Sequence, residues 1–430
     1  MKKAFYFVLI IMLICTSFLC GFTYTDFSRN PSIPNLVALL EQAPSRLLLG
    51  IRAELESSKA DVECTDAYWQ IYSYISNNYF GKTPDPKQLT YSAIRGMLAA
   101  LGDRYTRFLD PEQNKEMQSE NRGDFEGIGA ELDVKDGYVF IKNPLPNSPA
   151  KNAGLKKNDV ILKVDDTLIH GMDIDEVVKR IRGPRGTKVR ITIKREGVPE
   201  PMEFEITRQV IISPMVEVEM KDDESKIGYI ALRQFNEKSD EQFDQALTKL
   251  EADKVQALIL DLRNNPGGLL DVAVDIGSRF IDNGDIVIIQ NKGGERTSLR
   301  VNPSQHNHKR YPLVVLINEM SASASEIVAG AIQDHKAGKL VGVPTFGKGL
   351  VQQIFNLEDG SAVAISTAKY LTPLGRDVDK QKIKPDVIVE PTDEDIKAEN
   401  DVQLKKAIEI LKAELQSNFK TTTARDHRKS

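Results

Sequence analysis

A serine-rich segment late in the chain constrains this protein more than any other feature. The segment Ser321–Glu326 (SASASE) stands between the apolar run Leu313–Ile317 and a stretch whose apolar residues recur at helical spacing. We therefore expect a strand, then the serines, then a helix whose first turn has unpaired amide groups and a partial positive charge. A serine at that place lies beside a natural anion site, which suits a hydroxyl that attacks a carbonyl group.

Serine is also a preferred helix N-cap, and on these six residues alone capping is the stronger interpretation. A second segment changes that balance. Lys348 lies between Gly347 and Gly349, after the apolar run 340–344, and Gln352 follows four residues later. Glycines allow a close approach of neighbouring backbone, and an apolar setting lowers the pKa of a lysine. Positions i and i+4 share a face in a strand and nearly so in a helix, so we expect Gln352 to hydrogen-bond Lys348.

This pair of segments is what a serine–lysine hydrolase requires. A serine hydroxyl is a poor nucleophile until a base takes its proton, and a desolvated lysine can act as that base. None of the five histidines accompanies a G-x-S-x-G elbow, so a Ser-His-Asp triad is the weaker hypothesis. The chemistry needs no cofactor. We expect no metal site, because His306 and His308 have no third ligand nearby in the sequence.

Four segments of the chain resemble the carboxyl-terminal processing proteases, also called tail-specific proteases. They are 261–271 (DLRNNPGGLLD), 318–330 (NEMSASASEIVAG), 344–352 (PTFGKGLVQ) and 367–373 (TAKYLTP). The resemblance covers about residues 60–392 in the expected order. It implies that Ser323 is the nucleophile, that Lys348 is the general base and that Gln352 supports this base.

Such a protease needs amide donors for the oxyanion that forms during attack. The amide of Ala324, next to the expected nucleophile, is one candidate. The resemblance favours a second donor from Gly267 or Gly268, and the choice between them stays open. A plain strand-to-helix turn is an alternative use of this glycine pair.

Residues 123–208 resemble a PDZ domain. They contain the loop Gly127-Ile128-Gly129-Ala130, the segment 153–166 (AGLKKNDVILKVDD) and a helical pattern over Ile174–Ile181. PDZ domains add a peptide as an extra strand, and their loop amides hold its terminal carboxylate, so Gly127, Ile128, Gly129 and Ala130 are the expected peptide-binding residues. Arg182 resembles a family position proposed to link peptide occupancy to activation. A solvated turn cation is an equally open interpretation of Arg182.

The N-terminus indicates export. Two lysines follow Met1, and an almost unbroken apolar stretch covers residues 4–22 without a clear small-x-small cleavage site. We expect a signal peptide or membrane anchor over 1–25, with slight preference for an anchor, and a location in the cell envelope. Residues 26–60 are expected to form a helical tether. A contact between copies of the chain is the alternative interpretation of this segment, so a homo-oligomer stays open. The net charge of −5, with both signs interspersed, gives no indication of a nucleic-acid partner.

The whole chain of 430 residues is expected to be a multidomain protein of α/β and α+β class. A helical N-terminal region should span 61–120, with helices at 66–80 and 90–101, and the PDZ domain 123–208. An α/β catalytic domain should span 209–392, with strands near Ile227–Leu232, Ala257–Asp261 and Leu313–Ile317. A C-terminal helix and tail should complete 393–430.

Two further expectations concern single segments. The segment Leu101–Thr106 matches the family's helical N-terminal region, which is expected to pack on the catalytic core. Lys382 stands where relatives often carry glycine, and we expect it to lie away from the chemistry.

The sequence thus predicts an exported serine endopeptidase that captures C-terminal tails of proteins or peptides and cleaves them. Two other hypotheses stay open. The chain could be a catalytically silent PDZ scaffold, or a hydrolase of small esters rather than peptides. Retention of Ser323, Lys348 and Gln352 together argues against the first, and a peptide-capturing module argues against the second.

Overall fold

The computed structural model describes residues 66–426, and the side chains of 66–417. The expected signal or anchor segment 1–25 and tether 26–60 lie outside the described residues, as do residues 61–65 of the expected helical region. Within the described range, no helix combines the length and apolarity needed to cross a bilayer. The chain divides after Leu89 into two compact units, and each is described by itself.

The described part of the first unit is helical, with a helix over 66–78. Helix α5 (Pro86–Ala99) then begins at a proline, a residue that fits the first turn of a helix because no partner is needed for its missing amide proton. The sequence predicted helices here. It assigned Pro86 to the connecting turn and started the second helix at Thr90, which was wrong by one turn.

The core of the second unit is a six-stranded sheet in the order β10-β11-β12-β15-β16-β19. Strand β10 is antiparallel to β11, and the other neighbours are parallel. The strands are β10 (Val216–Asp222), β11 (Ile227–Leu232), β12 (Ala257–Asp261), β15 (Leu313–Ile317), β16 (Lys339–Gly342) and β19 (Val387–Ile388). The predicted bounds of β11, β12 and β15 are confirmed.

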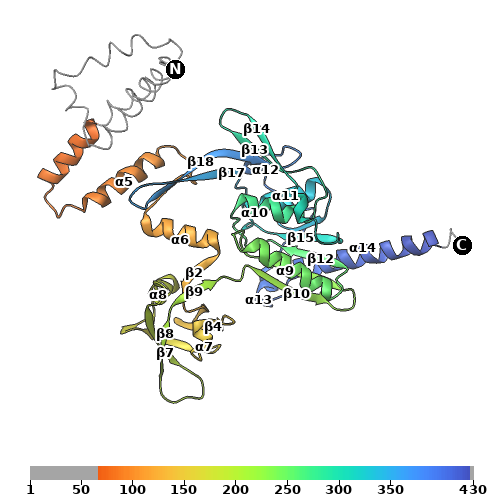
Figure 1. The fold of residues 1–430 in the computed structure, drawn as a ribbon, viewed down its shortest axis with the longest axis horizontal. Coiled ribbons are helices and arrows are strands. Elements are labelled where there is room, and N and C mark those ends of the chain that lie inside the picture. The colour runs from red at the N-terminus through yellow and green to blue at the C-terminus, as the bar shows by residue number, and fades with distance from the viewer. Residues whose placement is uncertain (1–65, 427–430) are drawn as a thin grey trace, which may run out of the picture. The chain divides into compact units, whose positions relative to one another are not determined.

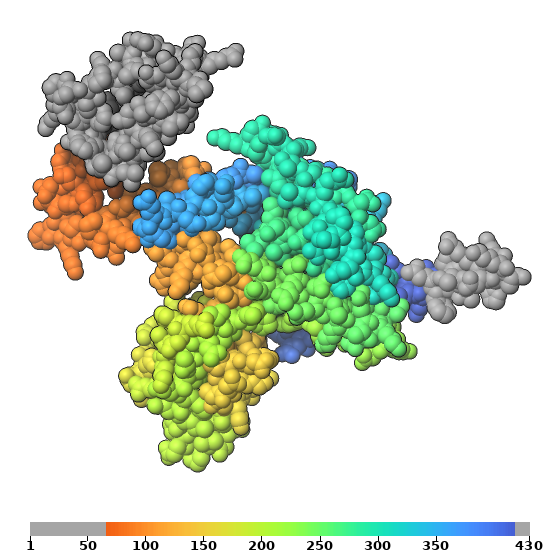
Figure 2. Space-filling model, in the orientation of Figure 1, coloured from red at the N-terminus to blue at the C-terminus, as the bar shows by residue number. Residues whose placement is uncertain are grey.

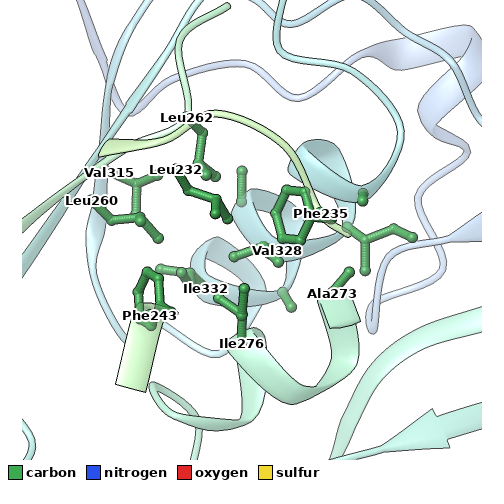
Figure 3. Close-up of a cluster of buried hydrophobic side chains, with 14 of the residues drawn as sticks. Leu232, Phe235, Phe243, Leu260, Leu262, Ala273, Ile276, Val315, Val328 and Ile332 are labelled. Carbon is green, nitrogen blue, oxygen red and sulfur yellow. The ribbon is translucent and has the colours of Figure 1, made fainter. Parts of the chain in front are cut away.

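Both faces of this sheet are covered. Alternate residues of each strand point to opposite faces, so in β12 Leu258 and Leu260 face one layer while Ala257 and Ile259 face the other. Helices α9 (Ser239–Ala252), α10 (Leu270–Ser278) and α11 (Ala324–Asp334) pack on the first face (Figures 1 and 3). Helix α14 (Val402–Asp426) packs on the second face through Ala407 and Leu411. This double cover explains why the strands are near-continuous apolar runs.

A second, antiparallel sheet carries the segment after the expected base. Its order is β1-β18-β13-β14, with β17 also paired to β18. The strands are β1 (Arg107–Leu109), β13 (Asp285–Asn291), β14 (Arg296–Arg300), β17 (Leu350–Asn356) and β18 (Ala362–Leu371). In the space-filling view, β17 and β18 form the blue band beside the green and cyan region (Figure 2). The expected helical region 61–120 therefore includes a strand, β1, which directly follows Leu101–Thr106 and joins this sheet by pairing with β18.

A third sheet has the order β3-β4-β5-β7-β8, with β6 paired to β5, and has its own apolar core. Its elements are β3 (Ala130–Lys135), β4 (Tyr138–Pro144), α7 (Pro149–Asn152), β5 (Val160–Val164), β6 (Thr167–Leu168), α8 (Ile174–Ile181), β7 (Lys188–Lys194) and β8 (Met202–Thr207). The bounds of α8 match the predicted helix. Strand β3 lies at the edge of this sheet, and α8 lies along it.

Short elements complete the unit. Strands β2 (Asp124–Gly127) and β9 (Gln209–Ile212) pair at the two ends of the segment that holds the third sheet. The helical pieces are α6 (Pro111–Arg122), η1 (Pro303–Gln305), α12 (Val378–Gln381) and α13 (Asp393–Lys397). Helices and strands are both present in the second unit, and the predicted multidomain α/β class is confirmed.

Candidate active site

The three serines of the SASASE segment have different roles in the structure. The hydroxyl groups of Ser321 and Ser325 are buried and donate hydrogen bonds to the carbonyl oxygens of Leu262 (2.8 Å) and Asn265 (2.9 Å). The hydroxyl of Ser323 donates to no group among the described residues. The outer serines therefore fasten the turn to the neighbouring loop, and only the middle serine keeps its proton available.

The backbone of Ser323 is unusual. Ser323 stands immediately before α11 with φ 55° and ψ −114°, a conformation that residues with a side chain rarely adopt. It also occupies the N-cap position and forms a capping box with Glu326. Capping and a reactive role are thus compatible in one residue. Strain of this kind gathers at functional sites, where surrounding contacts hold it in place.

Glu326 anchors both halves of the site. Its side chain is fully buried, and Oε2 accepts hydrogen bonds from the backbone amides of Ser323 and Lys348, both at 2.9 Å. Oε1 accepts from the amide of Gly347 at 2.7 Å and from Thr345 Oγ1 at 2.5 Å. A buried carboxylate is costly unless such donors surround it, so the serine turn and the lysine loop are fixed by one group.

Tyr370 joins the same two segments from β18. Its hydroxyl lies 3.2 Å from the carbonyl oxygen of Ser323, 3.4 Å from Glu326 Oε2, and within hydrogen-bond distance of the carbonyl oxygen of Lys348. Burial, followed by the nearby charge of Glu326, raises the pKa of Tyr370 well above its ordinary value. The phenol therefore stays protonated as a donor to these acceptors.

Lys348 Nζ donates a hydrogen bond to Gln352 Oε1 at 3.2 Å, which is the contact that the i, i+4 spacing predicted. The ammonium group also lies 5.1 Å from the centre of the Tyr105 ring, and Gln352 in turn donates to the carbonyl oxygen of Tyr105. No hydrogen bond joins Lys348 Nζ to the Ser323 hydroxyl among these described groups. Lys348 is therefore turned toward Gln352 and Tyr105 in this state.

The pKa of Lys348 is lowered, as the sequence predicted. Burial is the largest cause, and the positive charge of Arg107 adds to it, while Glu326 and Asp103 act in the opposite direction. A lowered pKa increases the fraction of uncharged amine near neutral pH, and only this form can accept a proton.

The glycine pair lies directly against Ser323. A Cβ atom on Gly267 would lie 2.7 Å from Ser323 Cβ and 2.9 Å from the nitrogen of Ala324, so no larger residue fits there. The amide of Gly267 donates to Asn265 Oδ1 at 2.9 Å. The amides of Gly268 and Ala324 donate to no group among the described residues. Of the three predicted donors, these two amides are thus uncommitted.

The glycine loop 127–130 precedes the edge strand β3, with Gly127 at the end of β2 and Ala130 at the start of β3. The carbonyl groups of Ile128 and Gly129 accept hydrogen bonds from Ala150 and Leu145, whereas their amides donate to no described residue. This leaves amide protons beside an open sheet edge, which is the arrangement that holds a terminal carboxylate in strand addition.

Arg182 lies against the start of that loop. Its guanidinium lies 4.8 Å from the centre of the Phe125 ring. Its Cγ is 3.8 Å from the position that a Cβ atom would take on Gly127. It also lines a hollow of about 200 Å³ together with residues of α6 and with Met215 and Gln234 of the catalytic segment. Arg182 is exposed and also packs against an aromatic ring, so the solvated cation and the link to peptide occupancy both stay open.

Several residues of the site were missed or misplaced by sequence reasoning. Glu326 was visible as the third residue after Ser323, the spacing of a capping box, but its role depends on distant partners. Tyr105 was expected only to pack on the core, yet it contacts Lys348 and Gln352. The prediction that Lys382 lies away from the chemistry was wrong. Its Cγ is only 3.0 Å from the position that a Cβ atom would take on Gly347, the residue before Lys348. No cluster of histidine, cysteine and acidic side chains suited to a metal is found within the described range.

Two segments of the chain match known protein families. Residues 226–389 match the model of peptidase family S41, and residues 140–195 match the PDZ domain. The chain is 37% identical over 385 residues to the carboxyl-terminal-processing protease of Synechocystis sp., covering 88% of each chain. It is 39% identical over 323 residues to the carboxy-terminal processing protease CtpA of Bacillus subtilis, covering 75% of this chain and 68% of that protein.

A solved structure supports the fold alone. It is described as a candidate S41 protease from Bacteroides fragilis, with a TM-score of 0.53 at 17% identity, and the match covers 78% of this chain and 92% of that one. The identity and coverage of the Synechocystis relative decide the assignment. This chain belongs to the carboxyl-terminal processing proteases, serine-type peptidases of family S41 with a PDZ domain.

Proposed function

We propose that this protein is an exported endopeptidase that captures the C-terminal tails of proteins with its PDZ domain and cleaves them with Ser323 and Lys348. The single observation that carries the proposal is the shared anchor. Glu326 binds the amides of Ser323 and Lys348 with one carboxylate oxygen. The Ser323 hydroxyl keeps its proton available, and the amine of Lys348 has a lowered pKa.

The reaction begins when Lys348 leaves its contact with Gln352 and turns to Ser323. Its uncharged amine takes the hydroxyl proton as Oγ forms a bond to the carbonyl carbon of the substrate. The oxygen of that carbonyl becomes an oxyanion, and the amides of Gly268 and Ala324 donate to it. The C–N bond breaks as the Lys348 ammonium returns the proton to the leaving amine. Water then hydrolyses the acyl-enzyme, with Lys348 again as base.

Tail capture brings the substrate to this site. A peptide adds to the open edge of β3, and its terminal carboxylate is held by the amides of Ile128 and Gly129. Arg182 packs on Phe125 at the start of the same loop, so it can sense whether the loop is occupied. The substrates are therefore proteins or peptides with an accessible C-terminus, and no cofactor takes part.

A location in the cell envelope is the second part of the proposal, and the N-terminal sequence supports it. The apolar run 4–22 follows two lysines, and it directs export whether or not it is later removed. We propose that it stays as an anchor on the extracytoplasmic face. Cell fractionation of the full chain should find it in the membrane fraction at unprocessed mass, and a shortened chain in the soluble fraction would overturn the anchor.

The experiment for the activity compares three substrates side by side. The purified full chain is incubated with an unstructured protein, with the same protein whose C-terminus is blocked as an amide, and with a small ester. We expect cleavage of the first, slower cleavage of the second, and little ester turnover. Ser323→Ala should abolish cleavage, whereas Ser298→Ala on the exposed face of β14 should retain it.

The outcomes separate the rival hypotheses. Tail binding without cleavage would identify a silent scaffold, and ester turnover without proteolysis would identify a small-ester hydrolase. Persistent proteolysis by Ser323→Ala would show that the nucleophile is misassigned.

A further inference from the structure

A positively charged hollow adjoins the loop that carries Lys348. Its volume is about 470 Å³, and it is lined by the side chains of Arg376, Asp379, Lys380, Gln381, Lys382 and Lys384. Arg376 is paired with Asp334. The ammonium groups of Lys382 and Lys384 form no ion pair with any described residue. Even with Asp379 counted against them, the lysines give the hollow a net positive charge.

Lys382 adopts a backbone conformation that favours glycine. Its φ is 54° and its ψ is 170°, a combination that residues with a Cβ atom rarely adopt. The conformation is fixed on both sides, because the Lys382 amide donates to the Val378 carbonyl and the Ile383 amide donates to Thr345 Oγ1, each at 2.9 Å. Glycine would avoid this strain.

The Lys382 side chain lies over the reactive loop. A Cβ atom on Gly347 would lie 3.0 Å from Lys382 Cγ and 3.6 Å from Lys382 Cε. Gly347 is the residue before Lys348, and its amide binds Glu326. On the other side of Lys348, a Cβ atom on Gly349 would lie 2.6 Å from the nitrogen of Asp379. The hollow and the catalytic loop are thus in direct contact.

This contact gives the hollow access to a bound substrate. Lys382 packs beside Gly347, the residue before Lys348, so its flexible side chain is the charged group of the hollow that lies against the loop which a bound substrate chain would meet. Lys382, like Lys380 and Lys384, is exposed, so its ammonium group can pair with a carboxylate that arrives from solution. Such a pair attracts an acidic side chain of the substrate without any covalent step.

We infer that Lys382, with Lys380 and Lys384, forms a subsite that selects an aspartate or glutamate close to the scissile bond of the substrate. The inference rests on the proposed function, since it names the substrate class of the same site. It assigns Lys382 a part in specificity, distinct from the capture of the terminal carboxylate by the PDZ loop.

The test uses quenched fluorescent peptides that share one cleavable core and one C-terminal tail. In each peptide a single position on either side of the scissile bond carries Glu or Gln. We expect kcat/KM for the Glu peptide to exceed that for its Gln partner by about threefold to fivefold at one or two adjacent positions, as for an exposed ion pair. In 1 M salt, where the Debye length is about 3 Å, this ratio should approach one.

Variants assign the effect to Lys382. In Lys382→Gln the ratio should fall toward one, because kcat/KM for the Glu peptide falls more than that for its Gln partner. Lys382→Arg should restore the ratio. Lys254→Gln is the matched control, because Lys254 is also an exposed lysine with positive φ (62°) but lies at the end of α9.

Each outcome decides between the hypotheses. Equal rates for Glu and Gln peptides at every position, or a Glu preference that Lys382→Gln leaves unchanged, would overturn the subsite and leave the protease intact. Failure to cleave any peptide would contradict the proposed function and the subsite together.

Discussion

One oxygen of Glu326, Oε2, accepts hydrogen bonds from the backbone amides of both Ser323 and Lys348 at 2.9 Å. The two amides belong to separate segments, one at the start of α11 and one before β17. Because the carboxylate is fully buried, these bonds are not exchanged with water. The backbone positions of the two reactive residues are therefore set by a third residue that does not take part in the proposed proton transfer.

The first prediction concerns Glu326→Gln. A glutamine amide would place an NH₂ group against backbone amides that are donors themselves, so two buried donors would lose their acceptor. We expect the free energy of unfolding to fall by about 3 kcal/mol and kcat/KM to fall by about a hundredfold. Urea unfolding and peptide cleavage measure the two effects.

Glu319→Gln is the control for this variant, because Glu319 is exposed and precedes the same serine segment. It should leave both quantities unchanged. A Glu326→Gln protein with unaltered stability and turnover would show that Glu326 does not fix the positions of Ser323 and Lys348.

The second prediction concerns pH and Lys348. The base must be uncharged, so activity should rise as pH increases through the pKa of Lys348 and fall as pH decreases through it. Because burial and the charge of Arg107 lower this pKa, the rise should lie below the ordinary range of a lysine. Arg107→Gln removes one cause and should move the profile of kcat/KM to higher pH.

Lys348→Arg should be inactive at every pH, because a guanidinium group does not release its proton in this range. An Arg107→Gln profile that stays in place, or moves to lower pH, would contradict the electrostatic part of this prediction.

The third prediction separates the two glycines beside Ser323. Gly267→Ala places a methyl group 2.7 Å from Ser323 Cβ and should displace the nucleophile, lowering kcat by about a hundredfold. Gly268→Ala places a methyl group 2.0 Å from the carbonyl oxygen of Phe235, so it should lower thermal stability and, by shifting the amide proposed to bind the oxyanion, lower kcat as well.

Gly294→Ala serves as the control for these two variants. Gly294 also has positive φ (84°), but a Cβ atom there would meet nothing within 4 Å. It should cost about 1 kcal/mol of stability and no activity. If Gly267→Ala behaved like Gly294→Ala, the close packing on Ser323 would have no catalytic importance.

Regular elements with strong apolar patterns were predictable from the sequence. The bounds of β11, β12, β15 and α8 follow from runs of apolar residues or from helical spacing, and burial in a doubly covered sheet enforces the same pattern. The contact of Lys348 with Gln352 was predictable because it is local in the sequence.

The remaining parts of the site depend on contacts between distant residues. Strand β1 has only three residues, too few to show the alternation of apolar and polar residues that indicates a strand. It forms because it pairs with β18. Tyr105 reaches Gln352 as a consequence of that pairing. The position of Lys382 over Gly347 likewise depends on how two loops meet, so its place in the sequence gave no indication of it.

The fourth prediction concerns Tyr105, whose ring faces the ammonium group of Lys348 at 5.1 Å. Tyr105→Phe keeps the ring and the backbone carbonyl that binds Gln352, so turnover should stay near that of the unaltered protein. Tyr105→Ala removes the ring, leaves Lys348 poorly positioned and should lower kcat by about tenfold. An equal loss in both variants would instead assign the effect to the phenol hydroxyl.

Covalent labelling of the full chain with a serine-directed fluorophosphonate, read by peptide mass spectrometry, tests directly whether Ser323 is the nucleophile and Lys348 its base. One adduct is predicted, on Ser323, and its rate of formation should increase with pH in step with peptide cleavage. Lys348→Met should slow labelling by about a hundredfold or more. An adduct on another serine would show that Ser323 is not the nucleophile, and labelling of Lys348→Met at the rate of the unaltered protein would show that Lys348 is not its base.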